Sequence, residues 1–327
     1  MIYSPRDLEI FIITYNRWEL LDLTLKSILL QDNDEFKITV IDNGGELNNK
    51  TRNKLVKSNK FSIVRFEKND QLGVWSKIAS LTQKKWMMIF HDDDILHHSY
   101  ISSVFKLLEN YPKVNLIGCY NEGFKTDFTN FNWNIKNSLR CKYLPNEKDL
   151  TMYYVEGKPI PFCSLIYRTS KYKEINITEL QNKFGKIFDR PLAIESSKNG
   201  GALILTSNFV KTRIHENQDS NTLVDSNYSA YLLNLIKYYY DLLGSYIFSK
   251  YGRVFLKNNY VIFLEFFNWG GLNEYSFDEF VKLGIKNKST SVLTYSLSKF
   301  YNLLFNFKLK IKFLKRLYIN LKNLLDA

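Results

Sequence analysis

Residues 86–94 read WMMIFHDDD, an apolar run that ends in one histidine and three consecutive aspartates. A short apolar run bounded by polar residues is typical of a strand buried inside a sheet. Four similar runs lie nearby in the sequence, at residues 8–14, 36–41, 61–66 and 114–119. Together the five runs predict the strands of one central sheet.

Segments with helical spacing of apolar residues separate these runs, at 18–30, 48–58, 74–83 and 98–110. Strands that alternate with helices predict an α/β fold with a mostly parallel sheet. The 327-residue, 38.7 kDa chain is long enough for one large domain or two smaller ones.

The second half of the chain is less regular. Residues 121–160 show no clear period and predict loops and short elements, and from about residue 221 the pattern becomes mainly helical. In between we expect a strand at 162–168, a helix at 188–200 and a strand at 202–206.

Polar side chains follow four of the predicted strands. The clusters are Thr14-Tyr15-Asn16-Arg17, Asp42-Asn43-Gly44, Asn69 with Gly73, and Asp92-Asp93-Asp94. In a parallel sheet the carboxyl ends of the strands share one edge, and ligands bind beyond that edge. The sequence therefore predicts one binding site built from all four clusters.

The aspartate triplet predicts a divalent cation. Three adjacent carboxylates repel one another, and oxygen ligands of this kind suit Mg²⁺ or Mn²⁺. The alternative is a helix N-terminus, where an aspartate caps the first turn. Capping accounts for one aspartate, or two, more easily than for three. His97 and His98, just beyond the triplet, are expected to be surface residues at the start of a helix.

Composition excludes several classes of protein. Hydrophobic residues make up 45% and charged residues 24%, which excludes disordered and coiled-coil chains. The three cysteines, Cys119, Cys141 and Cys163, form no CxxC motif and predict a reduced, cytoplasmic setting. We find neither a signal peptide nor an apolar run long enough to cross a bilayer.

The formal net charge of +12 is concentrated near the C-terminus. Residues 281–325 hold ten Lys and Arg residues and no Asp or Glu, which leaves 35 basic and 33 acidic residues elsewhere. Phe300, Leu303, Leu304 and Phe307 begin an apolar stripe at helical spacing, although residues 305–313 also alternate as a strand would. A basic amphipathic helix favours contact with an anionic membrane surface. The alternatives are an ordinary packed helix and, with less support, nucleic-acid binding, for which no motif is present.

Two nucleotide-binding signatures are missing. No GxGxxG follows the first predicted strand, and the chain has no GxxxxGK[ST]. A glycine loop that cradles phosphate is therefore not expected. Binding of a nucleotide diphosphate through a divalent cation is still compatible with the sequence.

The order strand–TYNR, strand–IDNG, N-x-x-x-G, strand–HDDD resembles the family-two glycosyltransferases with the GT-A fold, a Rossmann-like α/β fold. The resemblance covers roughly residues 8–220. It implies a metal-bound nucleotide-sugar donor, UDP foremost, and inversion at the anomeric carbon. It also implies a GT-A domain at 1–220, followed by a helical, basic and amphipathic region at 221–327.

The resemblance assigns donor-site roles to named residues. Thr14, Tyr15 and Arg17 match the nucleotide-pocket loop, and Asp42 matches the carboxylate that reads the base. Asn69 and Gly73 match the third motif. Asp92 and Asp94 match the DxD element that meets the ribose and the metal, and Asp93 between them is also assigned to the donor-nucleotide site. An Asx-turn role is the alternative for Asp42. His91 can also occupy the first position of the acidic motif, which would leave Asp93 and Asp94 facing the metal.

Two further stretches resemble family motifs. Asp189, in FDRP at 188–191, matches the position of the general base, with helix capping as its alternative role and Glu195 and the more distant Glu156 as competitors. RIHENQDS at 213–220 resembles R-x-H-x-x-Q-x-S, which makes Arg213 a phosphate ligand and His215 a metal ligand.

The expected function is transfer of a sugar to a glycan or lipid-linked acceptor in the synthesis of lipopolysaccharide, capsule or another surface polysaccharide. The basic tail would hold the enzyme on the cytoplasmic face of the inner membrane. A nucleotidyltransferase and a non-catalytic, basic membrane- or polyanion-binding protein are the alternatives.

Overall fold

The computed structural model describes residues 3–45, 60–70, 73–125, 133, 135, 139–158, 160–214 and 228–244. The chain divides into two compact units. The first comprises residues 1–150 and 159–222, and the second comprises residues 151–158 and 223–327. The expected boundary at residue 220 stays a prediction. The basic tail at 281–325 and the expected helix at 48–58 lie outside the described residues.

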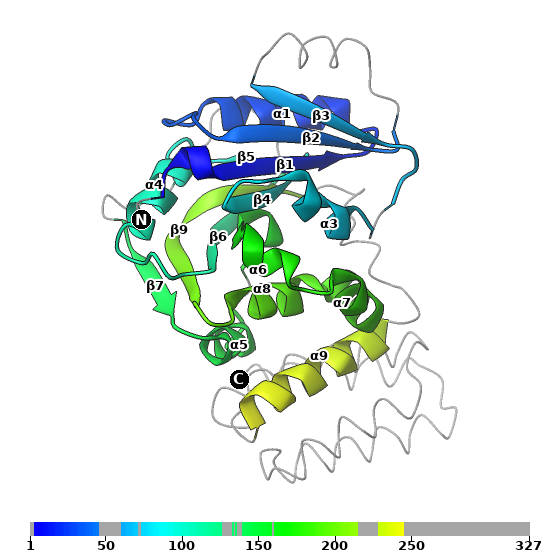
Figure 1. Cartoon of the computed structure of the whole chain (residues 1–327), viewed down its shortest axis with the longest axis vertical. Coiled ribbons are helices and arrows are strands. Elements are labelled where there is room, and N and C mark those ends of the chain that lie inside the picture. Colours follow the sequence, from blue (N-terminus) through cyan, green and yellow to red (C-terminus); the bar gives the residue numbers. More distant parts are fainter. Residues whose placement is uncertain are drawn as a thin grey trace, which may run out of the picture. The chain divides into compact units, whose positions relative to one another are not determined.

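One mixed sheet forms the frame of the first unit (Figure 1). The described strands are β1 (Leu8–Thr14), β2 (Lys37–Asn43), β3 (Phe61–Phe66), β4 (Trp86–His91), β5 (Ile95–Leu96), β6 (Leu116–Phe124), β7 (Cys141–Leu144), β8 (Ile166–Arg168) and β9 (Ala202–Arg213). Their order is β3-β2-β1-β4-β8-β6-β9-β5, and β7 pairs with β9.

The first four strands form the expected parallel part of the sheet. β1 lies between β2 and β4, with β3 beyond β2, and all these pairs are parallel. The short strand β8 is inserted between β4 and β6 and runs antiparallel to both. β6 therefore points the same way as β4 without touching it, and it pairs in parallel with β9.

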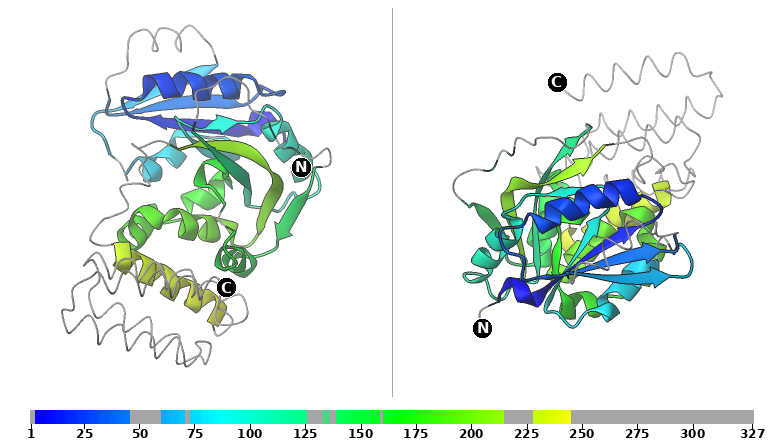
Figure 2. Two further views of the ribbon diagram at one scale, coloured as in Figure 1. Left: turned by 180° about the vertical axis from the view of Figure 1, so that it is seen from behind. Right: turned by 90° about the horizontal axis from the view of Figure 1, so that it is seen from above.

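Helices flank the sheet and connect its strands (Figure 2). In chain order they are α1 (Trp18–Leu29), α3 (Gly73–Ile78), α4 (Tyr100–Leu108), α5 (Glu147–Val155), α6 (Thr169–Lys173), α7 (Ile177–Phe184) and α8 (Asp189–Ser197). α9 (Tyr228–Leu243) belongs to the second unit. No helix in the described part of the chain combines the length and the apolar character that a bilayer span requires.

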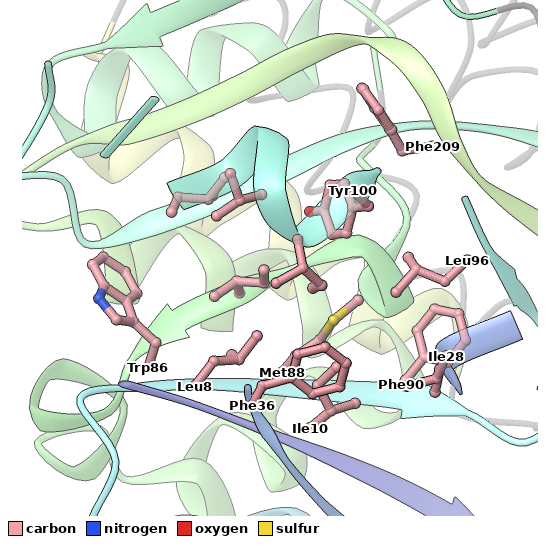
Figure 3. Packing of buried hydrophobic residues seen from close by; sticks show 14 of the residues in the cluster. Leu8, Ile10, Ile28, Phe36, Trp86, Met88, Phe90, Leu96, Tyr100 and Phe209 are labelled. Carbon is pink, nitrogen blue, oxygen red and sulfur yellow. The ribbon is translucent and has the colours of Figure 1, made fainter. Parts of the chain in front are cut away.

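Both faces of the central strands are buried, as a parallel sheet requires. Leu8, Ile10 and Ile12 alternate along β1 and pack in one cluster with Trp86, Met88 and Phe90 of β4. Figure 3 shows most of these side chains, from Leu8 and Ile10 of β1 and from Trp86, Met88 and Phe90 of β4, packed together with Tyr100 of α4 and Phe209 of β9. Phe11, Met87 and Ile89 are buried on the opposite face.

Several boundaries differ from the expected ones. β6 and β9 run further than the predicted strands at 114–119 and 202–206, because they pair with each other along most of their lengths. Residues 162–168 form a 3-10 turn (Phe162–Ser164) followed by the three-residue β8 instead of one strand. β7 and α5 are short elements within residues 121–160, where loops and short elements were expected.

Candidate functional site

The strand ends bring the polar clusters side by side in register. Thr14 of β1 pairs with Asp42 of β2, and Asp42 pairs with Arg65 of β3. On the other side of β1, Ile13 pairs with His91, the last residue of β4. The loop after β1, the end of β2 and the aspartate triplet therefore share one edge of the sheet, as the sequence predicts.

Arg17 connects the first cluster to the triplet. Its Nη2 lies 2.8 Å from Asp92 Oδ1, and its Nη1 donates to Asp93 Oδ2 at 3.1 Å. All three aspartates are buried. Burial raises the pKa of Asp92 to about 6, although the charge of Arg17 opposes this shift.

Asp94 is held in place from three directions. Its Oδ1 accepts a hydrogen bond from the backbone N–H of Arg213 at 3.1 Å, and its backbone carbonyl accepts one from Thr24 Oγ1 at 2.9 Å. Its Oδ2 lies 3.3 Å from His91 Nδ1. Burial lowers the pKa of His91, but Asp94 and its two neighbours outweigh that effect and raise it to about 9.

Asp42 is fully buried at the end of β2. Its Oδ1 accepts a hydrogen bond from the backbone N–H of Gly45 at 2.9 Å, and its Oδ2 lies 3.7 Å from Arg65 Nε. Burial raises the pKa of this carboxyl against the opposing effects of Gly45 and Arg65. This hydrogen bond reaches three residues along the chain, whereas an Asx turn reaches two, and it leaves Oδ2 facing Arg65.

Asn69 lies in the loop between β3 and α3, beside the end of β2, and Gly73 is the first residue of α3. Asn43 Nδ2 donates to Asn69 Oδ1 at 3.1 Å, and the backbone N–H of Gly73 donates to Asp70 Oδ1 at 2.7 Å. Gly44 has a φ of +82°, and a Cβ there would lie 2.2 Å from the backbone nitrogen of Asn69. The third motif therefore packs against the second one, and the described contacts do not join it to the triplet.

The loop after β1 turns sharply before α1. Asn16 has a positive φ of 54°, a conformation that asparagine tolerates better than most residues. Tyr15 is exposed next to it. This turn directs Arg17 toward the triplet and leaves the ring of Tyr15 available to a ligand.

Asp189 is the first residue of α8, on a different part of the chain from the other clusters. The N-cap position is Phe188, so Asp189 is not the N-cap residue, although its carboxyl accepts hydrogen bonds from backbone N–H groups at the start of the helix. Burial raises the pKa of its carboxyl, while Arg190, backbone N–H groups and His91 oppose the shift.

Aromatic side chains lie between Asp189 and the triplet. The ring of Trp75 contacts those of Phe162 and Phe188 at centroid distances of 4.8 and 6.1 Å. Phe162 also stacks on His91 at 6.1 Å with an interplanar angle of 24°. An apolar, half-buried surface of this kind excludes water from the neighbouring carboxyl groups and accounts for the raised pKa of Asp189.

Comparisons with known proteins show the family of this chain. The sequence profile of glycosyl transferase family 2 matches residues 9–174, about half of the chain. The chain belongs to glycosyl transferase family 2. It is therefore a glycosyltransferase that uses a nucleotide-sugar, and this separates it from the nucleotidyltransferase and non-catalytic alternatives.

Solved structures show the same fold. The S. aureus TarS 1–349 complex with UDP has a TM-score of 0.55 and 10% identity, over 84% of this chain and 80% of TarS. The complex of the same protein with UDP-GlcNAc has a TM-score of 0.57 and 11% identity, over 84% and 81% of the two chains. No curated protein sequence gives a significant match. At this identity the likeness establishes the GT-A fold of the family 2 enzyme.

The remaining predicted residues of the family 2 enzyme fall in different places. Arg213 is buried at the end of β9, where its Nε lies 3.4 Å from the backbone oxygen of Asp93 and its guanidinium packs over Phe124. His215 lies outside the described residues. Glu195 pairs with Lys198 at 2.6 Å, and Glu156 belongs to the second unit.

His97 was expected at the surface, but it is buried. Its ring packs against Trp133 and Phe209 at 4.8 and 5.7 Å, and its Nδ1 lies 3.2 Å from the backbone N–H of Ser99. Burial and the neighbouring His98 lower the pKa of His97 to about 4. His97 is a neutral core residue, whereas His98 is exposed as expected.

The triplet of the family 2 enzyme fits a divalent cation. Three buried carboxylates lie together at this site, and Arg17 contacts two of them, Asp92 and Asp93. Carboxylate oxygens gathered in this way are the ligand type that Mg²⁺ and Mn²⁺ accept. Sequence reasoning missed Trp75, Phe162 and Cys163 at this site, because each lies in a segment without a recognisable motif.

Proposed function

We propose that this glycosyltransferase moves a sugar from a UDP-sugar to a hydroxyl of a glycan or lipid-linked acceptor, with inversion at the anomeric carbon. The observation that carries the proposal is the in-register alignment of Asp42, Thr14 and the triplet along neighbouring strand ends. Solved proteins of the same fold bind UDP and UDP-GlcNAc, which supports UDP as the nucleotide.

The polar residues at the carboxyl ends of β2, β1 and β4 form one edge of the sheet. The β2 end of that edge suits the base of a nucleoside diphosphate, and the β4 end suits its ribose and phosphates. Asp42 lies at the β2 end, where a buried carboxylate can accept a hydrogen bond from an N–H of the base. Thr14, Tyr15 and Arg17 lie next along the edge and would line the nucleotide pocket. Asp92, Asp93 and Arg213 lie at the β4 end, toward ribose and diphosphate.

Asp92 and Asp94 would hold a divalent cation, Mn²⁺ or Mg²⁺, with His215 as a proposed third protein ligand. When bound, the cation would neutralise part of the diphosphate charge. Oxygen donors of the triplet are the ligand type that both ions accept. Arg17 and Arg213 keep the triplet in position through contacts with Asp92, Asp93 and Asp94.

Asp189 is the proposed general base. As the acceptor oxygen attacks the anomeric carbon, the carboxylate of Asp189 takes the hydroxyl proton. The bond from that carbon to the diphosphate oxygen breaks, and the electron pair leaves with the diphosphate. Attack on the side opposite the leaving group inverts the configuration. The raised pKa of Asp189 makes it a stronger base than an ordinary carboxylate.

The cellular role is proposed from the sequence and the family. A lipid-linked glycan of a surface polysaccharide is the proposed acceptor. The ten basic residues at 281–325 favour a peripheral position on the anionic, cytoplasmic face of the inner membrane. This segment lies outside the described residues, so the support is the charge and the apolar spacing alone.

The test is a transfer reaction with a panel of UDP-sugars and a lipid-linked glycan, with the product analysed by NMR. We expect one UDP-sugar to be consumed, a product of inverted anomeric configuration, and loss of turnover on chelation of divalent ions. A product of retained configuration would contradict direct displacement. GDP- or CDP-sugar use with no UDP-sugar use would contradict the nucleotide assignment.

A further inference from the structure

Cys163 brings a thiol to the triplet. Its Sγ, one carboxylate oxygen of Asp94 and a ring nitrogen of His91 all lie within 4.8 Å of one another. Among the described residues, this is the one place where three His, Cys, Asp or Glu side chains gather in this way. Cys163 and Asp94 are buried, whereas the side chain of His91 is 41% exposed.

The 3-10 turn Phe162–Ser164 holds this thiol rigidly. Phe162 stacks on the ring of His91, and Ser164 Oγ donates to the backbone oxygen of Cys119 at 3.1 Å. The hydroxyl of Tyr100 donates to the backbone oxygen of Ser164 at 2.6 Å. Cys163 is thus fixed from both sides, as a ligand of a preorganised site should be.

We propose that Cys163 is a thiolate ligand of the cation site, together with Asp94 and His91, and that the site therefore prefers Zn²⁺ or Co²⁺ to Mg²⁺. The inference rests on the cation site of the proposed function: it keeps Asp94 as a ligand, puts Cys163 and His91 in the places given above to Asp92 and His215, and so changes the metal class. On binding, a metal–sulfur bond forms, and the thiol proton leaves to solvent.

Ligand chemistry supports this preference. Thiolate and imidazole select zinc-like ions, whereas Mg²⁺ takes oxygen ligands and keeps several waters. A tetrahedral site with bonds of about 2.0–2.2 Å has ligand-to-ligand edges of roughly 3.3–3.6 Å. The 3.3 Å between His91 Nδ1 and Asp94 Oδ2 matches such an edge. Asp94 Oδ1 is already occupied by the N–H of Arg213, which leaves Oδ2 for the ion.

The exposed part of His91 gives the site an open side. Coordination deprotonates a thiol, so Cys163 would give up its proton on binding the ion.

The test is a Co²⁺ titration of the full-length protein, followed by absorbance spectroscopy. We expect a near-ultraviolet sulfur-to-cobalt charge-transfer band that saturates at about one ion per chain. The band should be lost in Cys163→Ser and kept in Cys141→Ser, because Cys141 lies on β7 and is a free cysteine of intermediate exposure. One equivalent of Zn²⁺ should abolish the band, and excess Mg²⁺ should not.

The melting temperature of Cys163→Ser is measured as well, to check that this variant folds. If Cys163→Ser melts at a much lower temperature, His91→Gln replaces it as the test variant and should weaken Zn²⁺ binding at least about tenfold. Absence of the band from the folded wild-type protein, or its survival in Cys163→Ser, would overturn the proposal. UDP binding that requires Mn²⁺ in a protein without the band would reject only the sulfur ligand and leave the proposed function standing.

Discussion

Arg17 Nη2 lies 2.8 Å from Asp92 Oδ1, and this ion pair joins the loop after β1 to the end of β4. Asp92 is fully buried, whereas the side chain of Arg17 is 34% exposed. The same guanidinium also donates to Asp93. One arginine therefore balances part of the charge of two buried carboxylates and fixes the distance between two of the predicted motifs.

Arg17→Ala should destabilise the protein by about 1–3 kcal/mol, because it leaves buried carboxylate charge without its partner. Urea unfolding at neutral pH measures this loss. Arg6→Ala is the matched control, since it removes an exposed ion pair with Glu35 and should cost less than about 1 kcal/mol. Equal effects of the two substitutions would contradict the role given to Arg17.

Asp92→Asn should change how stability depends on pH. The pKa of Asp92 is about 6 in the folded protein and about 3.9 in an unfolded chain, so the folded state binds this proton more tightly. The wild-type protein should therefore lose stability as the pH rises from about 4 through 6, by on the order of 3 kcal/mol.

The asparagine side chain cannot ionise, so the variant should lack this component. Urea unfolding of both proteins from pH 4 to 8, in the absence of divalent ions, measures the difference. Parallel stability curves for the two proteins would contradict the raised pKa.

Gly44→Ala should be strongly destabilising. A side chain at this positive φ is strained, and its Cβ would lie 2.2 Å from the backbone nitrogen of Asn69. Gly244→Ala is the control, because Gly244 also has a positive φ of +55° but nothing lies within 4 Å of an added Cβ. We expect a loss of about 1 kcal/mol at Gly244 and at least 2–3 kcal/mol at Gly44. Thermal unfolding of the two variants measures the difference, and a smaller loss at Gly44 would refute the close contact.

Asp189→Asn should lower kcat by about 10²–10⁴ with little change in UDP affinity, as expected for removal of a general base. Glu195→Gln, which removes a carboxylate paired with Lys198, should keep most of the activity. Because the pKa of Asp189 is raised, the wild-type rate should fall on the acid side at a pH above the ordinary carboxyl range. A fully active Asp189→Asn enzyme would transfer the base role to another residue.

The sequence predicts the parallel half of the sheet well, because each of its strands is a local apolar run with a polar end. Thr14, Asp42 and Asp92 lie at such ends, and parallel pairing alone brings them together. The insertion of β8 between β4 and β6 could not be predicted in this way. It depends on pairing between strands far apart in the sequence, and β8 is only three residues long.

The contacts of the candidate site likewise fall into those that the sequence predicts and those that depend on the fold. The contact between Arg17 and Asp92 follows from two motifs at neighbouring strand ends. Cys163 and Phe162 reach the triplet only through the fold, and no spacing rule links a lone cysteine to a distant aspartate. His97 was misassigned because its burial comes from rings of Trp133 and Phe209 that lie far away in the sequence.

The most direct test of a UDP-sugar site at the triplet is the melting temperature with UDP, with and without Mn²⁺, for the wild-type protein and Asp94→Asn. At about 100 times the dissociation constant, UDP with Mn²⁺ should raise the wild-type melting temperature by roughly 5 °C. Neither UDP alone nor UDP with Mn²⁺ should shift the folded variant in this way. An equal shift in both proteins, or no shift with any nucleotide diphosphate and metal, would contradict the assignment.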